Sequence, residues 1–357
     1  MSTMTGSDLL VSQPRSQVVI AMDKFRGTAN APALCDAVAI AAQRHGLNVD
    51  AQPMSDGGEG FSDAFDGDEI MVEACGPLEE PTTARIKLSR SAHGVVGIIE
   101  VADVIGRDRL LNPASYQALA ASSRGVGYLV VACQEEGVDS IIVGCGGSST
   151  SDGGLGCYWY VRDHGGLKVP VMVATDITAR FSGAIRYAVQ KGVSPDDLHI
   201  ITRRLEAIRR TYCTEQGVDV ERIERTGAAG GIAGGLIALG AAPISGFDAV
   251  ASAVRLKERI QRADLIITGE GSFDTGSLEG KVTVSLAEHL TRGTRLVLIC
   301  GTVNTGAATK FQSRFPDSLI ISLTERYGLE RSLNDTLSCV EHAADVEIGR
   351  WLLEQCA

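Results

Sequence analysis

The longest run of residues whose types could bind a ligand or take part in catalysis is the glycine loop at 144–156, which reads GCGGSSTSDGGLG. Glycines let backbone N–H groups approach an anion closely, and Ser/Thr hydroxyls add further donors. A helix is expected just beyond the loop, so its N-terminus can face the same anion. The pattern predicts a phosphate-binding loop, although a tight turn with Asp152 or Ser151 as helix N-cap is the alternative. The expected phosphate contacts are Gly146, Gly147, Ser148, Ser149, Thr150 and Ser151.

A second loop, at 55–60, places the carboxylates Asp56 and Glu59 in a turn flanked by glycines. Two carboxylates in such a turn can hold Mg²⁺ or accept a proton from a substrate hydroxyl. The same spacing fits a helix start in which Asp56 is the N-cap and Glu59 completes a capping box. The local pattern leaves both interpretations open.

A third loop, at 268–281, carries Glu270 and Asp274 and ends at Lys281. Acidic residues and one cation in a glycine loop suit the binding of a metal and a phosphate. The loop is not a Walker A motif, because Thr275 stands where that motif needs its first glycine. An exposed lysine at a helix start is the alternative for Lys281.

Two shorter segments complete the set. The stretch 227–235 is uncharged and includes Gly230 and Gly231; it would let an adenine or a phosphate approach the backbone, or form a tightly packed helix. Residues 23–27 place a carboxylate beside two cations, and Arg26 could grip a carboxylate or phosphate with two hydrogen bonds. A solvated turn is the alternative for this segment.

The elements that must position these loops alternate between strands and helices, which is typical of parallel sheets with helices on both faces. In such sheets, ligands bind at the carboxyl ends of the strands. We therefore expect an α/β fold with two lobes, each a three-layer parallel-sheet lobe, and an active site in the cleft between them. The first, discontinuous domain is expected to comprise residues 1–80 plus 285–357, and the second residues 81–284.

Composition limits the classes of function. The 357 residues suffice for two domains, and 33 Lys and Arg against 44 Asp and Glu leave a net charge of −11. A surface this acidic argues against nucleic acid or a membrane as partner. Nine cysteines without a C-x-x-C pair indicate reduced thiols and a cytoplasmic location. The uncharged stretch 226–247 is long enough to cross a bilayer, but its seven glycines favour close packing.

Taken together and in this order, the loops resemble those of the bacterial glycerate kinase family. The resemblance runs from Val18 to about Leu323, and its most specific motifs are PMSDGGEG at 53–60, IVGCGGSSTSDGG at 142–154, GAAGG at 227–231, and DLIITGEG at 264–271 with Gly280-Lys281. It implies two α/β lobes with substrate and ATP between them. It also implies Mg²⁺-dependent phosphorylation of D-glycerate to 2- or 3-phosphoglycerate.

The chain departs from the family pattern at several loops. Lys24 stands where the family usually has serine, and Arg26 where it has lysine. The segment 174–181 keeps Asp176 but lacks the asparagine that normally follows, and Arg124 adds a cation where a tyrosine often precedes the glycine. These loops would define the acceptor pocket. A kinase for a different hydroxy acid or sugar acid, or a catalytically inactive ligand-binding relative, are therefore the alternative functions.

The resemblance and the loop chemistry together imply roles for named residues. The expected catalytic residues are Asp152, Lys24, Arg26 and Asp176. The expected substrate-binding residues are Asp23, Asp56, Glu59, Arg124 and Lys281. The expected nucleotide contacts are the six residues of the first loop together with Gly230 and Gly231, and the expected metal ligands are Asp152, Asp176, Glu270 and Asp274. A small hydroxy acid is the expected partner, and a homodimer is the oligomeric state considered.

Overall fold

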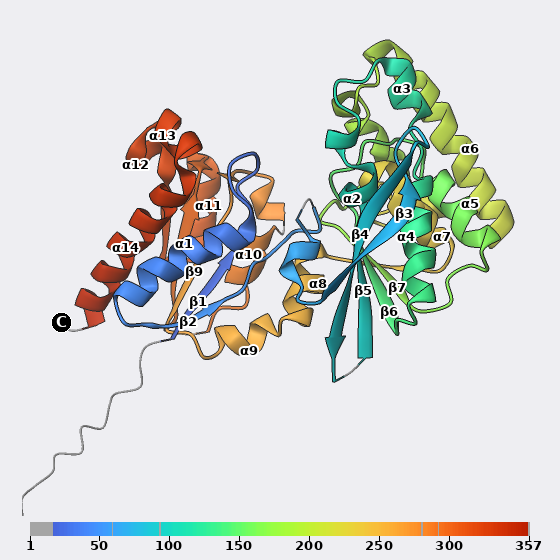
Figure 1. The fold of residues 1–357 in the computed structure, drawn as a ribbon. Helices are drawn as coiled ribbons and strands as arrows, with labels where there is room; N and C mark the ends of the chain where they lie inside the picture. Colours follow the sequence, from blue (N-terminus) through green and yellow to red (C-terminus); the bar gives the residue numbers. More distant parts are fainter. Residues whose placement is uncertain (1–16, 59, 93, 280, 292, 356–357) are drawn as a thin grey trace, which may run out of the picture.

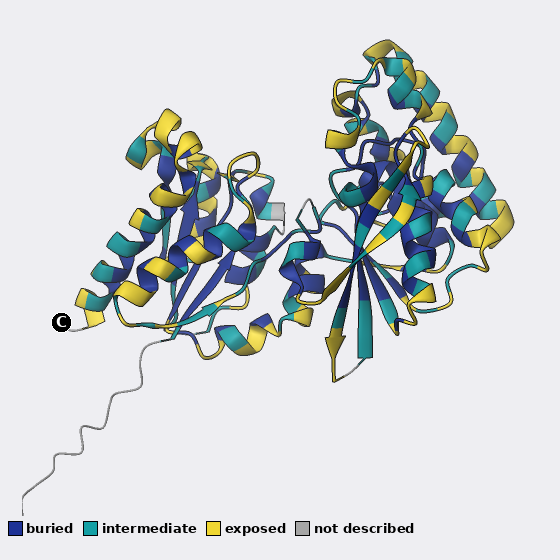
Figure 2. Ribbon diagram, viewed as in Figure 1, coloured by how far each residue is buried: buried dark blue, intermediate teal, exposed yellow. Residues whose placement is uncertain are grey.

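The computed structural model describes residues 17–58, 60–92, 94–279, 281–291 and 293–355. Its strands form two large sheets, and each sheet with its helices makes an α/β unit; the two units lie side by side (Figure 1). Figure 2 shows that the central strands of both sheets are mostly buried, while exposed residues lie on the outer faces of the helices and on the edge strands. The two-lobed α/β fold expected from the sequence is confirmed.

The first unit contains a five-stranded sheet in which every neighbouring pair is parallel. Its spatial order is β13 (Ser318–Ser322), β11 (Arg295–Cys300), β9 (Leu265–Gly269), β1 (Gln17–Met22) and β2 (Asn48–Ala51). Helices cover both faces, so the central strands are continuous apolar runs. One face packs against α1 (Ala31–Arg44) and α14 (Thr336–Gln355), and the other against α8 (Gly246–Ala253), α9 (Leu256–Ile260), α10 (Val282–Ala287) and α11 (Thr305–Arg314).

Strand β1 marks the point where the sheet changes direction. The chain continues from β1 to β2 on one side, whereas β9, β11 and β13 follow on the other. Loops leaving neighbouring strands at such a point diverge, which opens a crevice at their carboxyl ends. Asp23 follows β1 and Glu270 follows β9, so both carboxylates stand at this crevice.

The second unit contains a six-stranded sheet that is only partly parallel. Its order is β3 (Asp68–Cys75), β4 (Pro81–Ser91), β5 (Gly94–Glu100), β6 (Ser140–Gly144), β7 (Val171–Ala174) and β8 (Ala242–Ile244). The first three strands are antiparallel and the pairs from β5 to β8 are parallel. The expectation of a parallel sheet therefore fails at this edge, because short connections such as that between β4 and β5 can join only antiparallel neighbours.

The helices of the second unit include one break that matters for the site. Helix α3 ends at Ala120 and helix α4 begins at Arg124. Ser123, in the break, donates hydrogen bonds from its backbone N and its Oγ to Asp152. The helices of this unit are α2 (Val101–Ile105), α3 (Ser115–Ala120), α4 (Arg124–Glu135), α5 (Leu155–Asp163), α6 (Leu198–Gln216) and α7 (Ile232–Ala238).

The strands group differently from the expected domain boundaries. β9 lies within 81–284 but pairs with β1 in the first sheet, and β3 lies within 1–80 but belongs to the second sheet. Alternation of strands and helices along the chain does not say which sheet a strand joins, because pairing is decided by contacts far apart in sequence.

Most of the uncharged stretch 226–247 is buried, although Ala242 and Pro243 are exposed. It contains α7, whose residues are all buried, and the strand β8. Within the part of the chain that the structure describes, no helix combines the length and the apolar character needed to cross a membrane.

Candidate active site

Loops from both units enclose a cavity of about 470 Å³. The first unit contributes residues after β1, β2, β9, β11 and β13, and the second unit contributes the loops after β6 and β7. Its volume falls within the range of about 300–1,000 Å³ that is usual for small-molecule sites. The cavity therefore lies where the arrangement of the first sheet predicts a ligand site.

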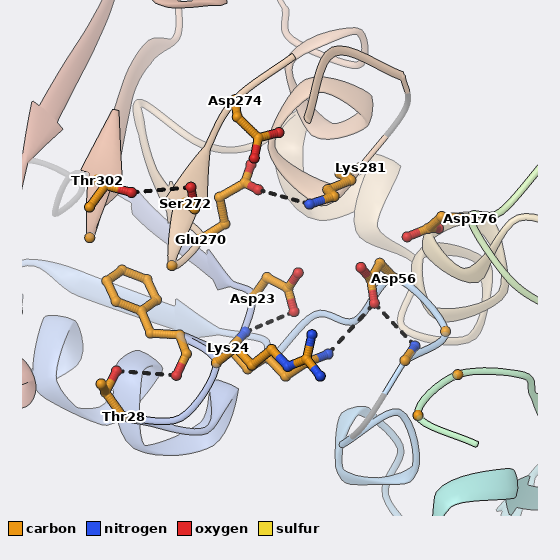
Figure 3. A pocket seen from close by; sticks show the side chains of 18 of the residues that line it. Asp23, Lys24, Thr28, Asp56, Asp176, Glu270, Ser272, Asp274, Lys281 and Thr302 are labelled. Carbon is orange, nitrogen blue, oxygen red and sulfur yellow. Dashed lines mark hydrogen bonds and ion pairs between the residues drawn. The ribbon is translucent and has the colours of Figure 1, made fainter. Parts of the chain in front are cut away.

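Five described residues with a carboxyl group line this cavity, and four of them, Asp23, Asp56, Asp176 and Glu270, influence one another's charge. Figure 3 shows Asp23 and Glu270 in the middle of the view, with Asp56 and Asp176 together on one side. Burial, followed by the charge of Asp56, raises the pKa of Asp23 to about 7 and that of Asp176 to about 10. Burial also raises the pKa of Glu270, although hydrogen bonds from Thr283 and Ser277 oppose the shift.

Two lysines partly neutralise this negative charge. Lys24 Nζ lies 3.6 Å from Asp56 Oδ1, and Lys281 Nζ lies 3.7 Å from Glu270 Oε2. Burial alone would raise the pKa of Asp56, but Lys24 and the other groups around the carboxyl outweigh it, so the pKa of Asp56 is lowered. Asp56 is therefore the carboxylate of the cluster that is most firmly ionised at neutral pH.

Two arginines also line the cavity, from opposite units. Arg26 follows β1 and was predicted from the sequence. Arg107, in a short turn after α2, was not predicted. Its only local signal is an arginine directly after Gly106, which matches no motif. The Arg107 backbone N donates to Gly147 O at 3.1 Å, which ties this turn to the glycine loop.

The carboxylates suit a divalent cation shared with a substrate. Among the residues described by the structure, no three His, Cys, Asp or Glu side chains stand close enough to hold a metal ion alone. Mg²⁺, however, is usually held by one or two carboxylates together with phosphate oxygens and water. Asp176 Oδ1 is buried without a hydrogen-bond partner, beside the charge of Asp56. A cation there would relieve the repulsion, so Asp56 and Asp176 are the residues that fit Mg²⁺.

The other two expected metal ligands are partly engaged elsewhere. Glu270 accepts hydrogen bonds from Thr283 Oγ1 at 2.5 Å and from Ser277 Oγ at 2.8 Å. Asp274 lines the cavity, but its Oδ1 accepts a hydrogen bond from Gly276 N at 2.8 Å. Both residues stabilise the loop after β9 and are less suited to bind a metal than Asp56 and Asp176.

The position of Asp152 does not match its expected roles as a catalytic residue and metal ligand. It does not line the cavity between the units. Its Oδ2 accepts hydrogen bonds from Ser123 N at 2.8 Å, Ser123 Oγ at 2.7 Å and Gly156 N at 3.2 Å. Its Oδ1 accepts from Thr150 Oγ1 and Gly154 N, both at 3.0 Å. A carboxylate with five internal donors organises its own loop, which fits a structural role and not the expected catalytic and metal-binding roles.

The hydroxyl groups of the same loop also point inward. Ser148 Oγ accepts a hydrogen bond from Lys191 at 2.8 Å, and Ser149 Oγ donates to Ile105 O at 2.9 Å. Thr150 Oγ1 is bonded to Asp152, and Ser151 Oγ is buried. Only Gly146 and Gly147 of the expected phosphate contacts line the cavity. Any phosphate contact from this loop would therefore come from these two glycines.

Lys191 is the residue behind the loop that sequence reasoning missed. Its side chain is buried, and its Nζ donates to Ser148 Oγ at 2.8 Å and to Thr150 O at 2.7 Å. Burial, together with the charge of Arg107, lowers the pKa of Lys191 to about 7. The lysine lies in a loop without a motif, so nothing in the local sequence indicates this contact.

Of the remaining predicted residues, Gly230, Gly231 and Arg124 lie outside the cavity. A Cβ on Gly230 would come within 2.1 Å of Thr150 O, and one on Gly231 within 2.6 Å of Gly153 Cα. These glycines therefore permit close packing against the first loop. Arg124 is exposed and lies over the Tyr160 ring, at 5.7 Å from its centroid. Glu59 lies outside the described residues.

The two units touch through glycines at the cavity wall. A Cβ on Gly146 would lie 2.3 Å from Gly58 Cα, closer than side-chain carbon atoms approach a backbone. The loop after β6 and the loop after β2 can therefore meet this closely only because Gly146 lacks a side chain. This contact brings Asp56 next to the glycine loop of the second unit.

Comparison with known proteins agrees with this architecture. Residues 18–159 and 163–352 match the model of the glycerate kinase family. A glycerate kinase of Halalkalibacterium halodurans is 29% identical over 92% of this chain and 96% of its own length. A glycerate 2-kinase of Escherichia coli is 30% identical over 76% of this chain and 81% of its own length. The crystal structure of a glycerate kinase 2 of Salmonella typhimurium superposes with a TM-score of 0.77 at 25% identity, covering 96% of this chain and 100% of that one. This chain belongs to the glycerate kinase family of enzymes.

Proposed function

We propose that this enzyme transfers the terminal phosphoryl group of ATP to a hydroxyl group of D-glycerate, giving 2- or 3-phosphoglycerate. The observation that carries the proposal is the cavity in which Asp23, Asp56 and Asp176 meet Lys24 and Lys281. Phosphoryl transfer asks a protein mainly to position its reactants and neutralise charge. The relatives named glycerate kinase support the choice of acceptor.

The charged side chains of the cavity suit different parts of the two substrates. Lys24 and Lys281 reach the cavity as point charges suited to phosphate oxygens. Arg26 and Arg107 carry planar guanidinium groups, which suit the carboxylate of a small hydroxy acid. When bound by Asp56 and Asp176, Mg²⁺ supplies further positive charge to the phosphates.

Asp23 is the candidate for accepting the proton of the acceptor hydroxyl. Its carboxyl is buried in the cavity wall, and its Oδ1 accepts a hydrogen bond from the backbone N of Lys24 at 2.7 Å. Its pKa is raised to about 7 by burial and the charge of Asp56, which is closer to neutral than the pKa of about 10 of Asp176. General bases work best with a pKa near the operating pH.

The test is an ADP-release assay with a panel of acceptors, followed by identification of the product. D-glycerate should give the highest kcat/KM, and dependence on both ATP and Mg²⁺ is expected. Preference for a larger hydroxy or sugar acid would assign a different kinase activity. Binding of ATP with Mg²⁺ but no turnover with any acceptor would identify a ligand-binding relative.

The acceptor site is tested by Arg26→Ala. We expect KM for D-glycerate to rise about tenfold or more, because a bidentate contact to a carboxylate is lost. Arg90→Ala is the matched control, since Arg90 is exposed on β4 and does not line the cavity. An unchanged KM for D-glycerate in Arg26→Ala would reject this role.

A further inference from the structure

The cavity has an end where charged side chains are replaced by hydroxyl groups and one apolar side chain. This end lies beyond the carboxyl ends of β9, β11 and β13 and includes the last turn of α13 (Leu329–Asn334). The residues that line it are Ser272, Gly301, Thr302, Thr324, Ser332 and Leu333. None of these described lining residues is ionisable, so this end differs in chemistry from the carboxylate cluster.

The hydroxyl groups form a row of two hydrogen-bonded sets, which adjoin at the neighbouring residues Gly301 and Thr302. Thr302 Oγ1 donates to Ser272 Oγ at 3.1 Å, across the short parallel pair β10 (Ser272–Phe273) and β12 (Thr302–Val303). Thr324 Oγ1 donates to Gly301 O at 2.8 Å and lies 3.3 Å from Ser332 Oγ. The row therefore presents donors and acceptors along one wall of the cavity.

Leu333 adds an apolar surface next to this row. Its side chain is 53% exposed although it lines the cavity. Leu329 and Leu337 lie four residues before and after it and are also exposed, but neither lines the cavity. Leu333 is therefore the member of this exposed leucine series that a bound molecule can cover.

The charged end lies on the opposite side of Glu270. Figure 3 shows Thr302 and Ser272 on one side of Glu270, and Lys281, Asp56 and Asp176 on the other. The strand order explains this arrangement, because β13 and β11 precede β9, β1 and β2 across the sheet. A long ligand lying along the carboxyl edge of the first sheet would have one end beside the hydroxyl groups and the other end beside the charged groups.

We propose that the nucleoside half of ATP occupies this uncharged end, with its base against Leu333 and its polyphosphate directed toward Lys281 and Lys24. This inference rests on the proposed function and adds the orientation of the donor. A base offers an apolar face and a ribose offers hydroxyl groups, which match Leu333 and the Ser/Thr row. A small hydroxy acid carries a carboxylate and has no comparable apolar face, so it suits the charged end beside Arg26 and Arg107.

In this orientation the base contacts the first unit and not the stretch 227–235. That stretch was one sequence-based candidate for contact with adenine. Its glycines pack against the loop of Thr150 and Gly153, and none of its residues lines the cavity. The nucleoside is therefore expected to contact loops after β9, β11 and β13 only.

The test compares Leu333→Ala with the matched control Leu337→Ala, whose side chain is 41% exposed on the neighbouring helix. Titration calorimetry measures the Kd of ADP and of inorganic pyrophosphate, each with Mg²⁺. We expect Leu333→Ala to raise the Kd of ADP five- to twentyfold and to leave that of pyrophosphate unchanged. Leu337→Ala should change neither value, and KM for D-glycerate should be the same in all three proteins.

The outcomes separate this inference from the proposed function. An unchanged Kd of ADP in Leu333→Ala, or wild-type protein that binds no ADP, would overturn the inference. A rise in KM for D-glycerate in place of the rise in Kd for ADP would also overturn it, because the acceptor would then occupy this end. If the wild type binds ADP with the expected Leu333 dependence but phosphorylates no glycerate, the inference stands and the proposed function falls. Thr302→Val is a second variant. We expect it to raise the Kd of ADP relative to wild type and to leave the Kd of pyrophosphate unchanged.

Discussion

Lys191 makes the stability of the second unit depend on pH in a calculable way. Its ammonium group is buried behind the glycine loop, where burial and the charge of Arg107 lower its pKa to about 7. In the unfolded chain the same group keeps a pKa of about 10.4. Between these pH values the unfolded state binds a proton that the folded state does not, so stability rises with pH.

The magnitude follows from the two pKa values. The slope approaches about 1.4 kcal/mol per pH unit where only the unfolded state is protonated, and it is shallower near the folded pKa. Between pH 7 and pH 9 the contribution of Lys191 to the free energy of unfolding should rise by about 2 kcal/mol. Lys191→Met removes the titrating group, so wild type should gain this amount relative to the variant over that interval.

Tryptophan fluorescence can follow the second unit separately. The chain contains Trp159 in α5 of the second unit and Trp351 in α14 of the first. In a Trp351→Phe background, urea unfolding monitored at Trp159 gives the free energy of unfolding of the second unit at each pH. Lys168→Met, which removes an exposed lysine of the same unit, is the control and should show no relative change.

A difference between wild type and Lys191→Met that stays constant from pH 7 to pH 9 would refute the reasoning. It would mean that the ammonium group remains protonated in the folded state. The hydrogen bonds to Ser148 Oγ at 2.8 Å and Thr150 O at 2.7 Å would then outweigh the cost of burial. The pH dependence therefore decides between desolvation and hydrogen bonding as the larger effect on this buried lysine.

Three further substitutions test the site. Asp56→Asn should lower kcat at least about 100-fold and raise the Mg²⁺ concentration needed for half-maximal activity in the ADP-release assay, because it removes the most firmly ionised carboxylate; near-normal Mg²⁺ dependence would exclude Asp56 as a ligand. Gly146→Ala should lower kcat about 100-fold, since a Cβ 2.3 Å from Gly58 Cα forces the two loops apart; an unchanged kcat would show that the contact is not needed for activity. Asp152→Asn should lower the Tm by about 5–10 °C through lost internal hydrogen bonds while kcat per folded molecule is retained; loss of kcat at an unchanged Tm would return Asp152 to the catalytic machinery.

The cavity depends on cooperation between the two units. Asp56 and Asp176 come from loops of different units, yet the charge of Asp56 strongly raises the pKa of Asp176. Ionising both carboxyls together is therefore unfavourable, and a bound cation would offset this cost. A change in the separation of the units would therefore alter affinity for Mg²⁺ as well as access of the substrates.

Much of the charged site could be predicted from the sequence. Asp23, Lys24 and Arg26 follow one buried apolar run, and Glu270 follows another. Since the carboxyl ends of parallel strands meet at one edge of a sheet, position directly after such a run is enough to bring these side chains together. Asp176 follows β7 of the other sheet, so its place beside these side chains depends on how the two units pack. The succession of glycine loops indicated the family.

Only the tertiary structure decided which side chains of the loops face the ligand. The sequence offered Asp152 both as a catalytic carboxylate and as a structural one, and the choice depends on Ser123, 29 positions away. Lys191 and its partner Ser148 are separated by 43 positions in the sequence. Strand β9 pairs with β1, the first strand of the chain. Local patterns determine strands and turns through neighbouring residues, whereas burial, hydrogen-bond partners and pKa depend on residues that only folding brings into contact.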